Sequence, residues 1–293
     1  MTRTAIVAGQ FYESDKESLI QQIEECFMHQ KGPGLPDKNN NKSKKIIGAI
    51  CPHAGYLFSG PCQAHSYKAI AGSTQSELYL FIGLSHAGFN SSISQEDWET
   101  PLGIIKNHKE FGNQLSKNTN IPIDEVPHMN EHSIEVQIPF LQFIHKYNKH
   151  NQRDLKFSAL IISHDRDYKE VSKAIAETIK QSNKKICIIA SSDFTHYGVN
   201  YGYLPFTENK KENLHKLDNS AIAHILNIDP YGFLEYANEK KATICGKLAI
   251  ATLLETCKLL GANKTELLSY YSSGDLTNDY DNSVGYASII VEK

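Results

Sequence analysis

The sequence lacks long hydrophobic runs. Its longest uninterrupted apolar segments, such as Ile186–Ala190, are far shorter than the ~20 residues that a membrane-spanning helix needs. The first ten residues also lack the charged segment and apolar stretch of a secretory signal peptide. We therefore expect a cytoplasmic protein that does not associate with membranes.

An excess of basic charge is missing as well. The 293 residues include 30 Lys and Arg against 33 Asp and Glu, which gives a net charge of −3. Proteins that bind nucleic acids usually concentrate positive charge against the phosphate backbone. The charge balance therefore argues against a nucleic-acid partner.

The six cysteines have no CxxC spacing, which argues against a zinc ribbon. In a chain of this length they are typical of reduced thiols in a cytosolic protein and not of a disulfide framework. Five of them lie in apolar or helical segments and are expected to be inert: Cys26, Cys51, Cys62, Cys187 and Cys257.

Cys245 has a different setting. It precedes Gly246 and Lys247 at the expected start of a helix. Free backbone N–H groups and the lysine there would lower the pKa of the thiol and favour a thiolate, which attacks electrophiles or binds soft metals.

Short β-branched runs alternate with segments of helical periodicity, and this alternation predicts a mainly parallel sheet flanked by helices. The expected strands are Lys45–Cys51, Leu78–Ile82, Lys156–Ile162 and Lys185–Ala190, followed by about Glu266–Ser272 and Ser283–Val291. The expected helices are Ser14–Met28, Pro61–Ala71, Glu131–Tyr147, Asp167–Gln181, Leu214–Leu226, Pro230–Asn238 and Lys247–Leu260. The sequence shows no linker and no repeat, so we predict a single α/β domain over residues 1–293.

Four details of these elements are also predicted. Ser14 and Glu17 resemble a capping box, and Lys31–Lys45 is polar and expected to be an exposed loop. Pro139 should kink its helix or mark the end of it. Asp229 is the expected N-cap of the helix that Pro230 begins.

A histidine follows each of the first four predicted strands: His53, His86, His164 and His196. The carboxyl ends of parallel strands meet at one edge of a sheet, where ligands bind. A single histidine at a strand end is usually structural, but four at one edge favour a metal or acid–base site.

Two carboxylates lie near histidines in the sequence. Asp193 precedes His196 by three residues and could fix the tautomer of its ring. Glu131 and His132 could form an acid–base pair, or they could simply begin a helix with Asn130 as N-cap.

Several segments together resemble the Memo family, whose prokaryotic members are called AmmeMemoRadiSam system protein B. The resemblance runs nearly end to end, and its segments are 8–12 (AGQFY), 52–60 (PHAGYLFSG), 131–137 (EHSIEVQ), 191–198 (SSDFTHYG), 243–246 (TICG) and 284–287 (VGYA). It implies a fold similar to the LigB-type class III extradiol dioxygenases, which hold Fe(II) with two histidines and a carboxylate.

The resemblance also implies residue roles. His53 and His86 match the two histidine ligands, and Cys245 falls where the carboxylate would be. His196 matches the acid–base histidine, with Asp193 as its neighbour, and His132 lines the same pocket. A thiolate makes a softer ligand set, which suits iron or copper most and zinc as well. The chain departs from the family pattern at two positions: Phe58 stands where Tyr is usual and Leu84 where Pro is common.

The sequence leaves three functions open. One is a metal-dependent redox enzyme that acts on a small aromatic or phenolic molecule, with His196 as proton carrier. Another is a non-catalytic metal carrier or a protein-binding module, and the resemblance implies radical-SAM and AMMECR-type partner proteins. The third is nucleophilic chemistry by Cys245 with His196 or His53 as base.

Overall fold

The computed structural model describes residues 1–37, 44–74, 76–147 and 155–293. The helices and 3₁₀ turns are α1 (Lys16–Met28), α2 (Tyr56–Ala71), α3 (Lys109–Thr119), α4 (Val126–Met129), η1 (Glu135–Gln137), α5 (Ile138–Tyr147), α6 (Tyr168–Ser182), η2 (Val199–Tyr201), α7 (Lys210–Leu226), α8 (Pro230–Glu239), α9 (Lys247–Leu259) and α10 (Gly274–Thr277). The strands are β1 (Thr2–Arg3), β2 (Ile46–Cys51), β3 (Leu78–Gly83), β4 (Ser92–Ser94), β5 (Asp97–Thr100), β6 (Gly103–Asn107), β7 (Lys156–Ile161), β8 (Ile186–Ser191), β9 (His196–Gly198), β10 (Lys264–Ser272) and β11 (Asn282–Glu292).

The four strands predicted first form the parallel centre of the sheet, in the spatial order β7-β3-β8-β2. All four are almost wholly buried, as their apolar runs predicted. Strands β11 and β10 extend the sheet beyond β2 in antiparallel fashion. The predicted fold class, one α/β domain with a mainly parallel sheet, is confirmed.

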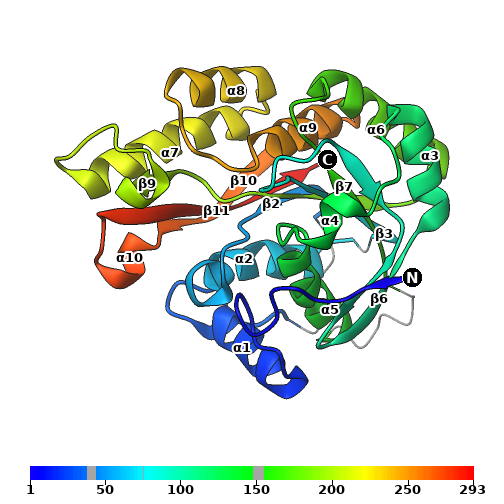
Figure 1. Cartoon of the computed structure of the whole chain (residues 1–293), viewed down its shortest axis with the longest axis horizontal. Helices are drawn as coiled ribbons and strands as arrows, with labels where there is room; N and C mark the ends of the chain where they lie inside the picture. The colour runs from blue at the N-terminus through cyan, green and yellow to red at the C-terminus, as the bar shows by residue number, and fades with distance from the viewer. Residues whose placement is uncertain (38–43, 75, 148–154) are drawn as a thin grey trace.

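Helices cover both faces of the sheet (Figure 1). Along β3, Leu78, Leu80 and Ile82 point to the face covered by α3, α6 and α9. The alternate residues Tyr79 and Phe81 point to the other face, which α1, α2 and α5 cover. Side chains alternate between the two faces of a strand, so each apolar run contributes residues to the hydrophobic cores on both sides of the sheet. Within the described ranges no helix is long and apolar enough to cross a bilayer.

Most predicted elements are present with small changes of boundary. Helix α8 begins at Pro230 after the predicted N-cap Asp229, whose side chain accepts from Gly232 N. The predicted capping box of the first helix is wrong, because α1 begins at Lys16 and Asp15 accepts from Ser18 N. Part of the loop expected at Lys31–Lys45 lies outside the described residues.

The helix predicted at Glu131–Tyr147 is wrong in its first half. Residues 131–134 are not helical, η1 follows, and α5 begins only at Ile138. Pro139 therefore lies at the second position of α5, where a missing N–H costs nothing, and it does not kink the helix. Asn130 ends α4 and does not cap α5.

Helix α3 and the short strands β4, β5 and β6 were not predicted from the sequence. Helix α3 is mostly polar and buries only a narrow stripe that includes Phe111 and Leu115. Polar residues dominate the rest of α3, and strands of three to five residues give almost no periodic signal.

Candidate metal centre

The site lies at the carboxyl edge of the central sheet. His53 follows β2 and His86 follows β3, while Ser191 ends β8 between those two strands. Cys245 comes from the segment before α9, which reaches the same edge because Ile244 forms an antiparallel bridge with Thr195. Residues far apart in the sequence therefore meet where the parallel strands end.

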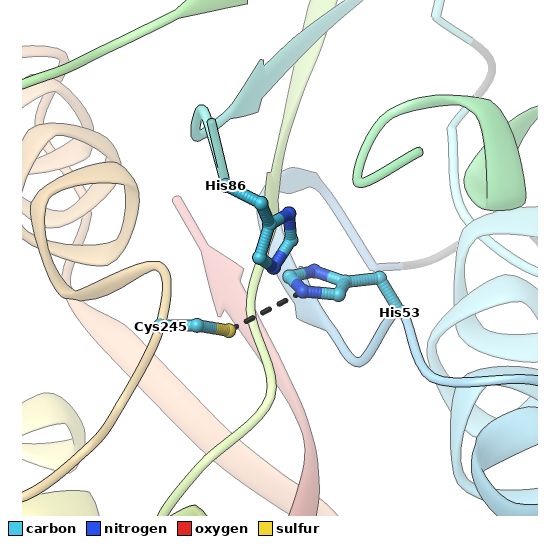
Figure 2. A group of neighbouring side chains, drawn as sticks. All are labelled: His53, His86 and Cys245. Carbon is cyan, nitrogen blue, oxygen red and sulfur yellow. Dashed lines mark hydrogen bonds between the residues drawn. The ribbon is translucent and has the colours of Figure 1, made fainter. Parts of the chain in front are cut away.

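Figure 2 shows His53, His86 and Cys245 pointing toward one another from three separate segments. The Cys245 sulfur lies 3.3 Å from His53 Nε2. One ligand atom from each of the three residues lies within 4.8 Å of the other two. The group thus has the spacing of a metal-ligand set.

The hydrogen bonds around His53 determine which ring nitrogen carries the proton. The Ser191 hydroxyl donates its single hydrogen to the Ser133 carbonyl, at 2.5 Å. Its oxygen therefore accepts from His53 Nδ1, at 3.0 Å. The lone pair of His53 is then on Nε2, which faces Cys245. Burial, followed by the neighbouring His86, lowers the pKa of His53 to about 3, so the ring is neutral.

Gln137 holds Ser191 in this arrangement. Its amide nitrogen donates to Ser191 Oγ and to the Pro52 carbonyl, each at 2.8 Å. Its amide oxygen accepts from Gln63 Nε2 at 2.7 Å and from the Tyr67 hydroxyl. Because both ends of the amide are occupied, Gln137 has one favourable orientation. Its hydrogen bond to Ser191 therefore fixes the position of the Ser191 hydroxyl.

His86 is oriented by Glu131. Its Nδ1 lies 2.9 Å from Glu131 Oε1, and its backbone N–H donates to Glu131 Oε2 at 2.7 Å. Burial opposes the charge of this carboxylate, yet the hydrogen bonds from His86 lower the pKa of Glu131 to about 2. An ionised carboxylate only accepts, so Nδ1 of His86 keeps its proton and the neutral ring presents Nε2. Although burial acts in the opposite direction, the hydrogen bond and charge of Glu131 raise the pKa of His86.

A transition metal ion fits these residues. Bonds of about 2.0–2.3 Å at tetrahedral angles would separate the ligand atoms by roughly 3.3–3.6 Å, close to the spacing of the group. In their neutral forms both imidazoles present an unprotonated Nε2, and the second nitrogen of each donates to an oxygen, as metal-binding histidines usually do. The donor set of two imidazole nitrogens and one sulfur suits copper, iron or zinc.

A second group of potential ligands, His86, Glu131 and His132, has a simpler explanation. Both carboxylate oxygens of Glu131 already accept hydrogen bonds, from His86 and from Ser133 N. This carboxylate therefore orients His86 and does not complete a second metal site.

The prediction of a depressed pKa for Cys245 is wrong for the metal-free chain. The Lys247 ammonium donates to Asn238 Oδ1 and not to the sulfur, and the backbone N–H groups of Asp193 and Gly246 favour the thiolate less than burial opposes it. Withdrawal from water, followed by the charge of Asp193, raises the pKa of the thiol. A metal ion at this position would displace the thiol proton and so favour the thiolate.

Close packing fixes the position of Cys245. A Cβ atom on the following Gly246 would lie 2.5 Å from the Ser191 carbonyl oxygen. Any side chain there would push Cys245 away from the end of β8. Glycine at this position allows the backbone before α9 to lie close to the end of β8.

His196 has a fixed tautomer, but Asp193 does not fix it. Nδ1 of His196 lies 3.1 Å from the carbonyl oxygens of Phe194 and Thr243, so it carries the proton and Nε2 is free to act as a base. Asp193 Oδ1 instead accepts from the backbone N–H groups of His53 and Ala54. The suggestion that Asp193 fixes the tautomer of His196 is therefore wrong, although both side chains line one cavity.

His132 stacks on His86, with ring centroids 4.5 Å apart and an interplanar angle of 13°. The Phe11 ring also packs against His132, with ring centroids 4.6 Å apart. Burial, followed by the charges of His53 and His86, lowers the pKa of His132 to about 4. His132 is therefore a neutral ring beside the metal ligands.

His164 does not join the site. It follows β7, which β3 and β8 separate from β2, a distance of about 14 Å at ~4.8 Å per strand. His164 is exposed, and Asp165 beside it accepts from Ser91. The inference that four histidines gather at this edge is correct for three of them.

A buried ion pair anchors the segment that carries Glu131 and His132. Arg3 donates to the Glu135 carboxylate at 2.7 Å and to the carbonyl oxygens of His128 and Glu131. Glu135 also accepts from the Tyr12 hydroxyl at 2.7 Å. The N-terminal residues thus hold this segment in place.

The side chains of the site line a cavity of about 550 Å³. One part, here called the metal wall, consists of His53, His86, His132, Asp193 and His196. Another part, here called the polar wall, consists of Ser273, Thr277, Asp279 and Asn282. The rings of Phe11, Phe58, Tyr201 and Tyr286 also belong to the lining. The cavity can therefore hold a small aromatic molecule beside the ligand set.

The sequence analysis missed three positioning residues: Ser191, Gln137 and, in this role, Glu131. Ser191 and Gln137 lie within the segments 191–198 and 131–137 that carry the family resemblance, which was the available signal. Their hydrogen bonds join different segments, so spacing along the chain could not reveal them.

Comparison with known proteins gives three findings. The family model described as Memo-like protein matches residues 3–290. A MEMO1 family protein of Nitrosopumilus maritimus is 40% identical over 99% of both chains. Others from Methanocaldococcus jannaschii (99% of both chains) and Methanopyrus kandleri (100% of both chains) are 38% and 35% identical.

Among solved structures, an uncharacterised protein of Escherichia coli K12 aligns with a TM-score of 0.51 at 10% identity. The alignment covers 84% of this chain and 99% of that chain. At this identity the likeness concerns the fold alone.

Proposed function

The chain belongs to the Memo-like family, and from this premise we propose that it binds a redox-active transition metal and oxidises a small phenolic molecule with dioxygen. The ligands are His53, His86 and Cys245. The observation that carries the proposal is that both imidazoles, in their neutral form, present an unprotonated Nε2 toward the sulfur.

The metal would supply Lewis acidity to a phenolic oxygen and the electron transfer between substrate and dioxygen. For a catechol, insertion of both atoms of dioxygen opens the ring and requires no further reductant. Iron and copper support such chemistry, whereas zinc does not change its oxidation state.

The protein side chains would bind the substrate and move its proton. His196 is half-buried in the same cavity, and its free Nε2 accepts the phenolic proton. The rings of Phe11 and Phe58 line the same cavity and offer apolar surfaces against which an aromatic ring can pack. Asp193 holds the backbone at His53 and presents its second oxygen 4.0 Å from His53 Nε2.

A non-catalytic metal carrier is the second candidate. The His86 side chain is 40% exposed and Cys245 is half-buried, so ligands from a partner could reach the ion. A thiolate and two imidazoles suit exchange of a soft ion such as Cu(I). In this case the metal ion is the cargo.

Element analysis of anaerobically purified protein tests the ligand set. His53→Ala and Cys245→Ser should lose the metal, whereas His164→Ala should keep it, because His164 also follows a strand but lies outside the site. Equal metal content in all four proteins would refute the assignment. Oxygen uptake with a panel of catechols and phenols then separates the two functions. Substrate-dependent uptake by metal-loaded protein supports the enzyme, and metal binding without uptake supports the carrier.

A further inference from the structure

The lining of the cavity has carboxylate side chains but no lysine or arginine among its described residues. The two carboxylates are Asp193 and Asp279. The two lysines at the start of α7 form ion pairs with carboxylates that do not belong to the lining. Lys210 pairs with Asp281, and Lys211 lies 3.0 Å from Asp275.

Asp193 and Asp279 each retain an oxygen for a ligand. Asp193 is 3% exposed, and only its Oδ1 accepts hydrogen bonds from the described chain, from the backbone of His53 and Ala54. Asp279 accepts one hydrogen bond, from Asp281 N to Oδ1 at 2.8 Å. In the described part of the chain, its Oδ2 has no hydrogen-bond donor.

Aromatic faces accompany these carboxylates. Phe58 is 37% exposed and Tyr201 is 44% exposed, and both rings line the cavity. The face of an aromatic ring attracts cations, and the attraction grows as water is excluded. A ligand cation would therefore meet a carboxylate and ring faces, whereas a ligand carboxylate would lie near Asp279 with no cationic side chain in the lining.

Resting on the proposed function, we infer that the cavity selects phenolic molecules that carry a protonated amine over those that carry a carboxylate. The phenolic end lies at the metal wall beside His196. The ammonium group on a short side chain lies at the polar wall, where Asp279 Oδ2 accepts its hydrogen bond.

Three catechols of similar size test this inference: dopamine, 4-ethylcatechol and 3-(3,4-dihydroxyphenyl)propionate. Their dissociation constants are measured anaerobically by calorimetry on zinc-loaded protein, because zinc permits binding without turnover. We expect dopamine to bind about fivefold more tightly than the carboxylate, with the neutral compound between them, since exposed ion pairs have modest effects.

Asp279→Asn should weaken dopamine binding about twofold to fivefold and leave 4-ethylcatechol unchanged. Asp281→Asn is the matched control, because Asp281 pairs with Lys210 and does not line the cavity. It should leave the order of the three ligands unchanged.

The outcomes separate the inference from the proposed function. If 4-ethylcatechol binds but the three affinities are equal, or the carboxylate binds best, the inference is wrong and the proposed function stands. An equal loss of dopamine affinity in Asp281→Asn and Asp279→Asn would also refute the role of Asp279. If none of the three compounds binds, the proposed function, with a phenolic molecule as substrate, is wrong.

Discussion

The metal wall and the polar wall of the cavity are built on different principles. The metal wall stands at the ends of buried parallel strands, and hydrogen bonds fix the tautomers of His53, His86 and His196. The polar wall comes from the connection between β10 and β11, where Thr277 and Asp279 are exposed. Coordination needs ligand atoms placed within tenths of an ångström, so it requires a rigid frame. Recognition of a substituent tolerates more movement, so an exposed loop is sufficient for it.

The largest expected effect concerns the ion pair that anchors the metal wall. Glu135→Ala leaves Arg3 buried without its partner and should lower the free energy of unfolding by about 3–5 kcal/mol. Urea denaturation measures this loss. Glu239→Ala removes an exposed pair with Lys240 and should leave the urea midpoint unchanged. Equal effects of the two substitutions would contradict the distinction between a buried and an exposed pair.

A buried carboxylate behind His196 makes a second prediction. Asp218 accepts from Thr195 N and from the Tyr270 hydroxyl, and burial raises its pKa to about 6. The charged form is penalised in the folded state, so the stabilising contribution is present below about pH 4 and is lost as the pH rises through 6. Between pH 4 and pH 7 the wild type should lose about 2 kcal/mol relative to Asp218→Asn.

Urea denaturation of both proteins at several pH values measures this difference. Asparagine retains an oxygen for Thr195 N and cannot ionise, which isolates the effect of the charge. A stability difference that does not change with pH would show that Asp218 does not titrate in this range.

Smaller losses should follow from removing the partners of the ligands. Ser191→Ala leaves His53 Nδ1 without its acceptor, and Glu131→Gln removes the charge beside His86. Each should weaken zinc binding about tenfold to a hundredfold, as changes behind metal ligands usually do. Competition with a chelator measures the affinity, and Ser273→Ala on the polar wall provides the control. A loss equal to that of Ser273→Ala would refute the positioning role.

The smallest effect is expected from the polar wall itself. Asp279→Ala should leave zinc affinity within about twofold of the wild type, because the side chain is exposed and has no contact with the ligands. Competition with the same chelator tests this. A tenfold loss would mean that the two walls are coupled and would remove the distinction between them.

Much of the fold could be predicted from the sequence because local patterns encode it. Strands β2, β3, β7 and β8 have β-branched apolar runs, and α6 and α8 have strong caps at Asp167 and Asp229. The segment at Glu131–Gln137 was misjudged, since its apolar spacing is helical while its polar side chains bond to distant partners. Tertiary hydrogen bonds overrode the local pattern there.

The site could be predicted in part for the same reason. Strand ends placed His53, His86 and His196 at one edge, local sequence singled out Cys245 and His132, and the resemblance assigned these two to the same pocket. The sequence could not reveal that His164 lies too far away, because strand order in space differs from strand order in the chain. Nor could it give the burial that raises the pKa of Cys245.

The sequence by itself determined which residues are available: alternating apolar runs, histidines after strands and a cysteine before a helix. The tertiary structure decided which of them meet, which ring nitrogen each histidine presents and how strongly each group is withdrawn from water. The physical reason is that secondary structure follows from neighbouring residues. Ligand geometry and protonation, by contrast, depend on groups such as Ser191, Gln137 and Glu131 that lie far away along the chain.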